Sequence, residues 1–281
     1  MKFYLFSSAF FILVFAGVFA YLSYERNTHE VQSAAQLQLQ GTALPPTLSI
    51  KHIDRPSLRL ASAKEYTAPV DEYPVHTLKY HFFTRQYHSY LGKGAQPGAS
   101  HPTVVLLHGS NRTGASLIDM WKEAADQNNL LLLAPDSADK EGWNKWRDPL
   151  GFLNSIIDDA DSHSNVDRDQ IYLFGHSAGG RHATSLATNQ SHPFRALATH
   201  GGFNDAKTLS LSSAPGYKVP VSLYLGSKDQ IFNVDVAKHT AKEFHAAGHN
   251  AELFVIDDHT HWYYGVGPEL NKQIWANISQ K

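Results

Sequence analysis

Six short apolar runs, separated by stretches with helical character, constrain the fold of this chain more than any other feature. Each run is apolar on consecutive residues rather than on alternate ones, which is typical of strands that are buried on both faces of a parallel sheet. The runs lie at residues 103–107, 130–134, 171–174, 195–199, 221–225 and 252–256. The sequence therefore predicts an α/β fold, a mostly parallel central sheet flanked by helices on both faces.

Amphipathic stretches between and after these runs predict the helices. Residues 150–160 place apolar side chains at helical spacing, and helices are also predicted at 235–248 and 269–280. Before the alternation begins, two β-rich segments at 75–83 and 85–91 are separated by a predicted turn. We therefore expect a hairpin to open the folded domain.

The composition excludes several classes of function. The chain has 281 residues, a net charge of −2 and 42% hydrophobic residues, which suits one large α/β domain and gives no indication of a nucleic-acid partner. Cysteine is absent, so disulfides, thiolate nucleophiles and cysteine-bound metals are excluded. The 17 histidines show neither HExxH nor zinc-finger spacing, so no metal is expected.

The amino terminus has the pattern of an export signal. After Lys2, residues 3–24 carry no charge, and small residues occur near Ala20, where cleavage would fit. The uncharged run is also long enough to span a bilayer uncut. We expect residues 1–24 to be a signal peptide or an N-terminal membrane anchor. The protein is then secreted or periplasmic, or it associates with the membrane through residues 3–24 if cleavage does not occur.

The segment after the amino terminus differs in composition from the rest. Residues 25–74 are rich in Gln, Ser, Ala and Pro, which is typical of a low-complexity spacer or a loosely packed extension. No internal repeat and no second domain are apparent. The predicted folded domain is therefore 75–281.

Ser177 lies between Gly175 and Gly179, after a predicted strand and before a predicted helix. Glycine weakens a strand, so its presence here indicates a backbone requirement other than strand stability. The G-x-S-x-G pattern at a strand-to-helix turn is typical of a nucleophile elbow, which lifts a serine hydroxyl above the edge of the sheet. We predict Ser177 as a catalytic nucleophile, and the alternative is a glycine-rich turn with an idle serine.

A serine nucleophile needs a base to take its proton and an acid to orient that base. In this architecture the acid follows the serine, and Asp229 lies just beyond the predicted strand that ends at Leu225. We expect Asp229 to be the acid. Asp235, Asp257 and Asp258 are alternatives, and Asp229 would otherwise be a helix-entry residue.

Two histidines, His259 and His261, follow the last predicted strand, and either would serve as general base. An aromatic run at 262–264 directly after His261 favours that residue, because packing would hold its imidazole. His259 would then be a loop residue bonded to Asp257 or Asp258.

Two further pairs of residues are candidates for the site. The backbone N–H groups of Ala178, after the nucleophile, and of Ser110, after the first apolar run, would form an oxyanion hole, unless 108–114 is an ordinary glycine loop. Trp143 and Trp146 follow the second run. They would either line the substrate pocket, stacking on a sugar or an aromatic acid, or anchor a loop against the core.

Four segments together resemble the α/β-hydrolase superfamily, and more narrowly its secreted esterases of the polyhydroxybutyrate-depolymerase and feruloyl-esterase type. They are VVLLHGSNRTG, VDRDQIYLFGHSAGG, LYLGSKDQIF and HWYY. The resemblance covers residues 75–281 and implies an α/β-hydrolase catalytic domain without a cofactor. It implies that Ser177 is the nucleophile, Asp229 the acid and His261 the base. In such esterases and in S-formylglutathione hydrolases, the catalytic histidine likewise precedes an aromatic pair.

The chain also departs from these relatives. Many of them have cysteine where Ser110 stands and carry disulfides, and the polymer-degrading enzymes carry an added binding module. These differences argue against a solid polymer as substrate. We expect an exported serine esterase that cleaves a small or oligomeric carboxylic ester through an acyl-enzyme intermediate. The alternatives are an acyltransferase or peptidase on the same fold, or a catalytically inactive binding protein.

Overall fold

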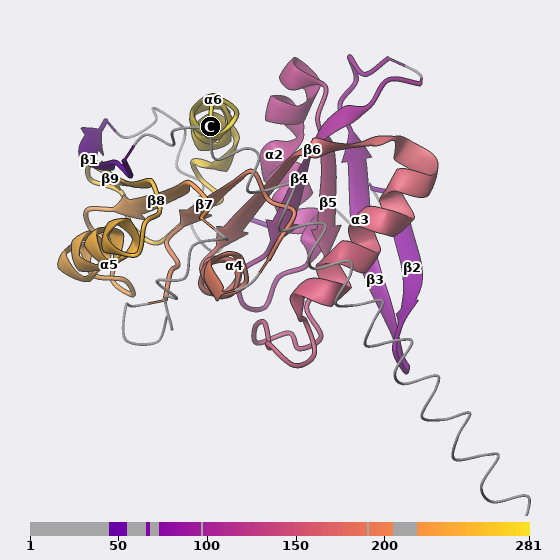
Figure 1. The fold of residues 1–281 in the computed structure, drawn as a ribbon, viewed down its shortest axis with the longest axis horizontal. Helices are drawn as coiled ribbons and strands as arrows, with labels where there is room; N and C mark the ends of the chain where they lie inside the picture. The colour runs from indigo at the N-terminus through magenta and orange to yellow at the C-terminus, as the bar shows by residue number, and fades with distance from the viewer. Residues whose placement is uncertain (1–44, 55–65, 68–72, 97, 190, 205–217) are drawn as a thin grey trace, which may run out of the picture. The chain divides into compact units, whose positions relative to one another are not determined.

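The computed structural model describes residues 45–54, 66–67, 73–96, 98–189, 191–204 and 218–281 (Figure 1). The chain divides into two compact units, 1–45 and 46–281, and nearly all described residues belong to the second. The predicted signal or anchor at 1–24 lies outside the described residues, as does most of the predicted spacer. Within the described part of the chain, no helix is long and apolar enough to cross a membrane.

The described residues form one nine-stranded sheet, in the order β1-β9-β8-β7-β6-β4-β5-β3-β2. In this spatial order, neighbouring strands are parallel from β1 through β9, β8, β7, β6 and β4 to β5. Strand β3 is antiparallel to both of its neighbours, β5 and β2. The expected parallel sheet and opening hairpin are thus confirmed. The strands are β1 Leu48–Ile53, β2 Val75–Tyr80, β3 Phe83–Leu91, β4 His101–Leu107, β5 Leu131–Pro135, β6 Val166–His176, β7 Ala196–His200, β8 Val221–Gly226 and β9 Ala251–Ile256.

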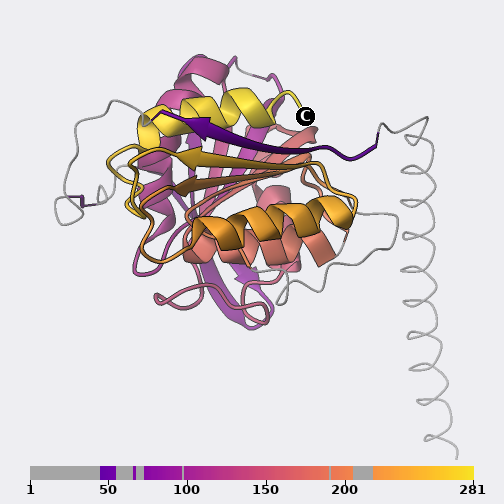
Figure 2. The ribbon, with the colours of Figure 1, turned by 90° about the vertical axis from the view of Figure 1, so that its left-hand side faces the viewer.

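Helices cover both faces of this sheet, as Figure 2 shows for α6 on one face and α5 on the other. One apolar core includes residues of α3, α4 and α5, and a second includes residues of α2 and α6. Along β6, Ile171 and Leu173 face the first core, whereas Tyr172 and Phe174 face the second. This two-sided burial explains the consecutive apolar residues. The helices are α2 Gly114–Asn128, α3 Leu150–Ser164, α4 Ala178–Asn189, α5 Val234–Ala246 and α6 Gly267–Ile278.

Strand β1 lies within the segment that the composition predicts to be a spacer. It pairs in parallel with β9, from Leu48 beside Ala251 to Ile53 beside Ile256. The Asn250 side chain also accepts a hydrogen bond from the backbone N–H of Thr47, at 2.9 Å. The folded unit therefore includes residues before the predicted start at residue 75.

Candidate active site

Ser177 occupies the turn between β6 and α4, and its φ of +53° is in the left-handed region. Its backbone N–H donates to the carbonyl of His200 at 2.9 Å. The flanking glycines have no room for a side chain, since a Cβ on Gly179 would lie 1.9 Å from the carbonyl oxygen of Leu107 and one on Gly175 would lie 2.4 Å from that of Gly179. The glycine spacing thus reflects close backbone packing around a strained serine.

Hydrogen bonds connect Ser177, His261 and Asp229. Nε2 of His261 lies 3.0 Å from Oγ of Ser177, and Nδ1 lies 2.9 Å from Oδ2 of Asp229. The Asp229 side chain is fully buried, while that of His261 is 17% exposed. The turns after β6, β8 and β9 therefore bring together three residues that are far apart in the sequence.

The surroundings of Asp229 favour its ionised form. Burial opposes ionisation, but hydrogen bonds from His261 and from the backbone N–H groups of Phe232 and Ile231 outweigh it and hold the pKa of Asp229 below its usual value. A carboxylate here accepts the Nδ1 proton of His261, which leaves the Nε2 lone pair facing Ser177. That is the tautomer a general base requires.

The alternative acids and base have other partners. Asp235 lies in the first turn of α5, Asp257 contacts Nδ1 of His52, and Asp258 forms an ion pair with Lys228. His259 is buried, and its Nε2 lies 2.9 Å from Nε2 of His200. The hydrogen bonds to Ser177 and Asp229 are made by His261.

A chain of buried histidines underlies the site. Nδ1 of His176 lies 3.1 Å from both the carbonyl oxygen and Nδ1 of His200, whose Nε2 contacts His259. Burial lowers the pKa of His176 to about 3 and holds that of His200 well below 6.5. The His176 ring packs 5.4 Å from that of His261. No pattern in the sequence predicts this chain, although His176 and His200 follow closely after apolar runs and are the last residues of β6 and β7.

Ser110 and Ser177 line one cavity of about 210 Å³, together with His261 and Trp262. Ser110 is exposed and lies in the loop that follows β4. Ala178 is the first residue of α4, where a backbone N–H has no partner within the helix. Both predicted oxyanion donors therefore belong to segments that border the Ser177 hydroxyl.

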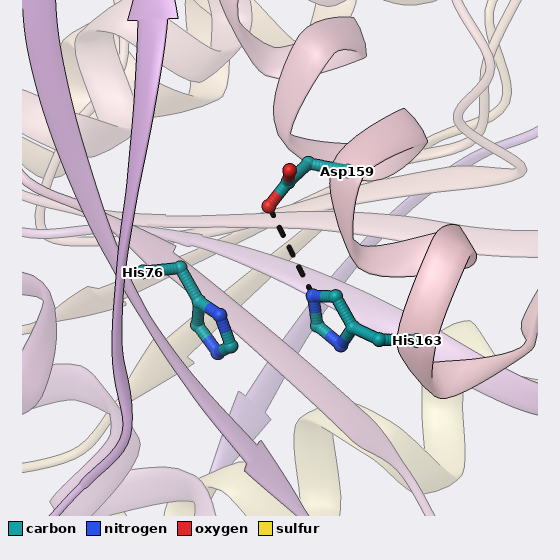
Figure 3. Close-up of side chains that lie close together, drawn as sticks. All are labelled: His76, Asp159 and His163. Atoms are coloured by element: carbon teal, nitrogen blue, oxygen red, sulfur yellow. Dashed lines mark ion pairs between the residues drawn. The ribbon is translucent and has the colours of Figure 1, made fainter.

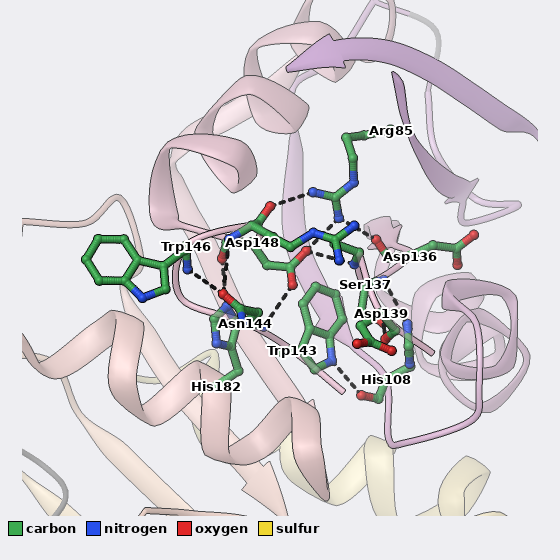
Figure 4. A network of polar contacts seen from close by, with 12 residues as sticks. Arg85, His108, Asp136, Ser137, Asp139, Trp143, Asn144, Trp146, Asp148 and His182 are labelled. Atoms are coloured by element: carbon green, nitrogen blue, oxygen red, sulfur yellow. Dashed lines mark hydrogen bonds and ion pairs between the residues drawn. The ribbon is translucent and has the colours of Figure 1, made fainter. Parts of the chain in front are cut away.

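The two tryptophans are placed differently. The indole N–H of Trp143 donates to the carbonyl of His108 at 2.8 Å, and its ring stacks on His182 (Figure 4). Trp146 is 81% exposed. Neither lines the cavity at Ser177. Trp143 thus anchors its loop against the core, which is the second of the two roles predicted for it.

A buried carboxylate holds the loop between β5 and α3 (Figure 4). Asp148 accepts from Arg85 at 2.6 Å and from the backbone N–H of Asn144 at 2.9 Å. The backbone N–H of Ser137 in this loop donates to Nε2 of His108, at 3.1 Å. The loop is therefore fastened both to β3 and to the segment that leads to Ser110.

His76, Asp159 and His163 form the candidate group for a metal ion within the described residues (Figure 3). The two imidazole rings stack at 4.7 Å with an angle of 9° between their planes. Ligand lone pairs lie in the ring plane, so parallel stacked rings do not direct them to a common ion. Tyr87 also donates to Asp159, at 2.7 Å. The cluster joins β2 and β3 to α3.

The model of the dienelactone hydrolase family matches residues 137–273. A search of curated proteins finds no match. The poly(3-hydroxybutyrate) depolymerase LpqC from Bordetella parapertussis is 21% identical, with a TM-score of 0.54 over 70% of this chain and 88% of that one.

Two further solved structures share the fold. A ferulic acid esterase is 16% identical, with a TM-score of 0.61 over 74% of this chain and 97% of that one. An S-formylglutathione hydrolase from Agrobacterium tumefaciens is 15% identical, with a TM-score of 0.56 over 73% and 94%. The match at 137–273 includes Ser177, Asp229 and His261. The chain thus has the α/β-hydrolase fold, and over residues 137–273 it is similar to the dienelactone hydrolase family.

Proposed function

We propose that the protein is an exported serine esterase that works through an acyl-enzyme intermediate. The hydrogen-bond chain from Ser177 through His261 to Asp229 is the observation that supports this most directly. Oγ of Ser177 attacks the ester carbonyl carbon while His261 takes the hydroxyl proton. Asp229 orients the imidazole and stabilises its charged form.

The attack places negative charge on the carbonyl oxygen of the substrate. In this proposal the backbone N–H groups of Ser110 and Ala178 donate to that oxygen, at the cavity that Ser110 and Ser177 line. Fixed donors of this kind act where the charge develops and need no reorganisation during the reaction.

The intermediate collapses as the ester C–O bond breaks, and His261 gives its proton to the departing alcohol. The acyl group is left on Oγ of Ser177. Water then attacks the acyl carbon as His261 takes its proton, and the acid departs when that proton returns to Ser177. One ester and one water become one acid and one alcohol, and no cofactor enters the balance.

The substrate is proposed to be a small or oligomeric ester. The solved structures with this fold include proteins described as a poly(3-hydroxybutyrate) depolymerase and a ferulic acid esterase. A series of p-nitrophenyl esters of increasing acyl length, run beside feruloyl, acetyl-xylan and hydroxybutyrate-oligomer substrates, would define the acyl and alcohol groups.

Replacing Ser177 tests the esterase proposal. Ser177→Ala should lower kcat by about 10⁴- to 10⁶-fold, because the three residues act as a unit. A fluorophosphonate probe should label the wild-type chain at Ser177 and leave the variant unlabelled, while circular dichroism shows that both are folded. A variant that keeps more than about a tenth of the wild-type rate would rule out Ser177 as the nucleophile.

Export is proposed from the uncharged segment at 3–24, which fits a cleaved signal or an uncut anchor. Mass spectrometry of the native protein distinguishes the two forms. The soluble form should begin near Tyr21, and the uncut form should stay in the membrane fraction. Intact protein with Met1 in the soluble cytoplasmic fraction would contradict both.

A further inference from the structure

Arg112 borders the same cavity as Ser177 and His261. Among the described residues that line this cavity, it is the one with a permanent charge, since the others are neutral side chains or histidines. Its side chain is only partly exposed. A fixed positive charge therefore lies beside the proposed reaction centre.

Aromatic rings hold the guanidinium of Arg112 in place. Its central carbon lies 4.9 Å from the ring centre of Tyr264, 5.4 Å from that of Tyr66 and 5.7 Å from that of Trp262. Tyr66 and Tyr264 stack on each other at 4.3 Å. Contacts with ring faces orient a guanidinium and leave the N–H groups at its edge available.

Arg112 has no carboxylate partner among the described residues. One of its N–H groups donates to the backbone carbonyl of Tyr66, at 3.4 Å. Asp119, which interacts with Tyr66, is already hydrogen-bonded to Lys122 and Tyr73. A guanidinium has five N–H donors, and the described residues occupy one of those of Arg112 with the Tyr66 carbonyl.

We propose that Arg112 binds a carboxylate carried by the ester substrate. The planar guanidinium matches the two oxygens of a carboxylate, and charge-assisted pairs of this kind are stronger than neutral hydrogen bonds. This inference rests on the proposed function, because it assigns a substrate class to the same cavity. Tyr66, from the segment before β2, is then a positioning residue that acts through Arg112.

Matched pairs of esters test the proposal on both sides of the ester bond. On the alcohol side, 4-acetoxybenzoate is compared with 4-acetoxybenzamide. On the acyl side, the mono-p-nitrophenyl ester of adipic acid is compared with p-nitrophenyl hexanoate, in which a methyl replaces the carboxylate. The wild-type enzyme should prefer the charged member of at least one pair.

Arg112→Gln should lower kcat/KM for that charged ester by about 10- to 100-fold, chiefly through KM, and change the neutral partner by less than about 3-fold. Arg112→Lys should retain part of the preference, because it keeps the charge but not the planar geometry. Arg195→Gln, at an exposed residue before β7, removes the same charge and should change neither ester. Thermal unfolding shows that each variant is folded.

Tyr66 provides a second test. Tyr66→Leu removes a ring from beside Arg112 and should reduce the preference for the carboxylate, whereas Tyr66→Phe keeps the ring and should preserve it. Loss of the preference in both variants, or in neither, would remove Tyr66 from the proposal.

Ligand-observed NMR with 4-hydroxybenzoate and 4-hydroxybenzamide measures recognition without catalysis. Stronger binding of the benzoate, lost in Arg112→Gln, supports the proposal even if neither ester is cleaved, in which case the proposed function fails alone. The proposal is overturned if neither ester pair nor the NMR pair shows a preference for the carboxylate. It is also overturned if Arg112→Gln affects charged and neutral members equally.

Discussion

The left-handed backbone at Ser177 is a conformation that a non-glycine residue adopts at a cost of about 1–3 kcal/mol. The surrounding backbone enforces it, since Gly175, Gly179 and Gly202 approach neighbouring carbonyls too closely to carry a side chain. A Cβ on Gly202 would lie 2.0 Å from the carbonyl oxygen of Ser177 itself. Close backbone packing at these three glycines therefore keeps the turn at Ser177 in its left-handed conformation.

Two histidine variants test the base. His261→Ala should lower kcat by several orders of magnitude, because Ser177 loses the group that takes its proton. His259→Ala removes a partner of His200 and should cost about tenfold or less in kcat. Steady-state kinetics on one p-nitrophenyl ester compares the two. A larger loss in His259→Ala would move the base to that residue.

The structure only partly supports packing by residues 262–264 as the reason to prefer His261. The sequence predicts that the aromatic run after it packs on the imidazole, but the ring contacts of His261 come from His176 and Phe232. Tyr263 instead reaches into the core, where its hydroxyl donates to Asn271 at 2.8 Å. The aromatic run fixes the backbone that carries His261, and the packing partners are distant in sequence.

At the scale of elements, the loop between β5 and α3 depends on the buried pair of Arg85 and Asp148. The side chains are 8% and 0% exposed, and the guanidinium also lies over the ring of Phe152. Breaking a buried pair from one side leaves an uncompensated charge, which costs far more than the loss of an exposed pair.

Asp148→Asn should therefore lower the free energy of unfolding by about 3–5 kcal/mol. Urea denaturation measures this. Asp158→Asn is the matched control, because Asp158 pairs with Arg168 at 2.8 Å but both side chains are at least half exposed. That change should cost no more than about 1 kcal/mol. Equal losses in the two variants would contradict a structural role for the buried pair.

Most strands and helices could be predicted from the sequence, because the spacing of apolar residues within each short segment indicates its secondary structure. Consecutive apolar residues marked β4 to β9, and helical spacing marked α3, α5 and α6. Strand β1 could not be identified, because it is a half-buried edge strand within a polar, low-complexity segment. The Arg85–Asp148 pair and the ring contacts of Arg112 join distant residues and leave no local pattern.

For the whole molecule, buried histidines make stability depend on pH. Burial lowers the pKa of His176 to about 3 and those of His192 and His249 to about 4. The unfolded chain binds these protons near pH 6.5, so the folded state is favoured above that pH and loses stability as the pH falls toward 4. Below about pH 4.5, protonation of Glu252, whose folded pKa is about 2, destabilises the fold further.

The free energy of unfolding should accordingly fall between pH 7 and pH 4. His249→Gln should flatten that fall by up to about 1.4 kcal/mol per pH unit, since one fewer buried imidazole must stay neutral. His239→Gln, on the exposed face of α5, should leave the slope unchanged. Urea titrations at several pH values measure both slopes, and parallel curves for the two variants would contradict the linkage.

The pairing of β1 with β9 bears on how a shortened form of this enzyme should be made. A recombinant chain that starts at residue 75 keeps Ser177, Asp229 and His261 but lacks β1 and Tyr66. Its β9 would present open N–H and C=O groups to other molecules, and exposed edges of this kind promote aggregation. A chain that starts at residue 46 keeps β9 paired with β1. We therefore expect the longer chain to be recovered in soluble form and the shorter one as aggregates.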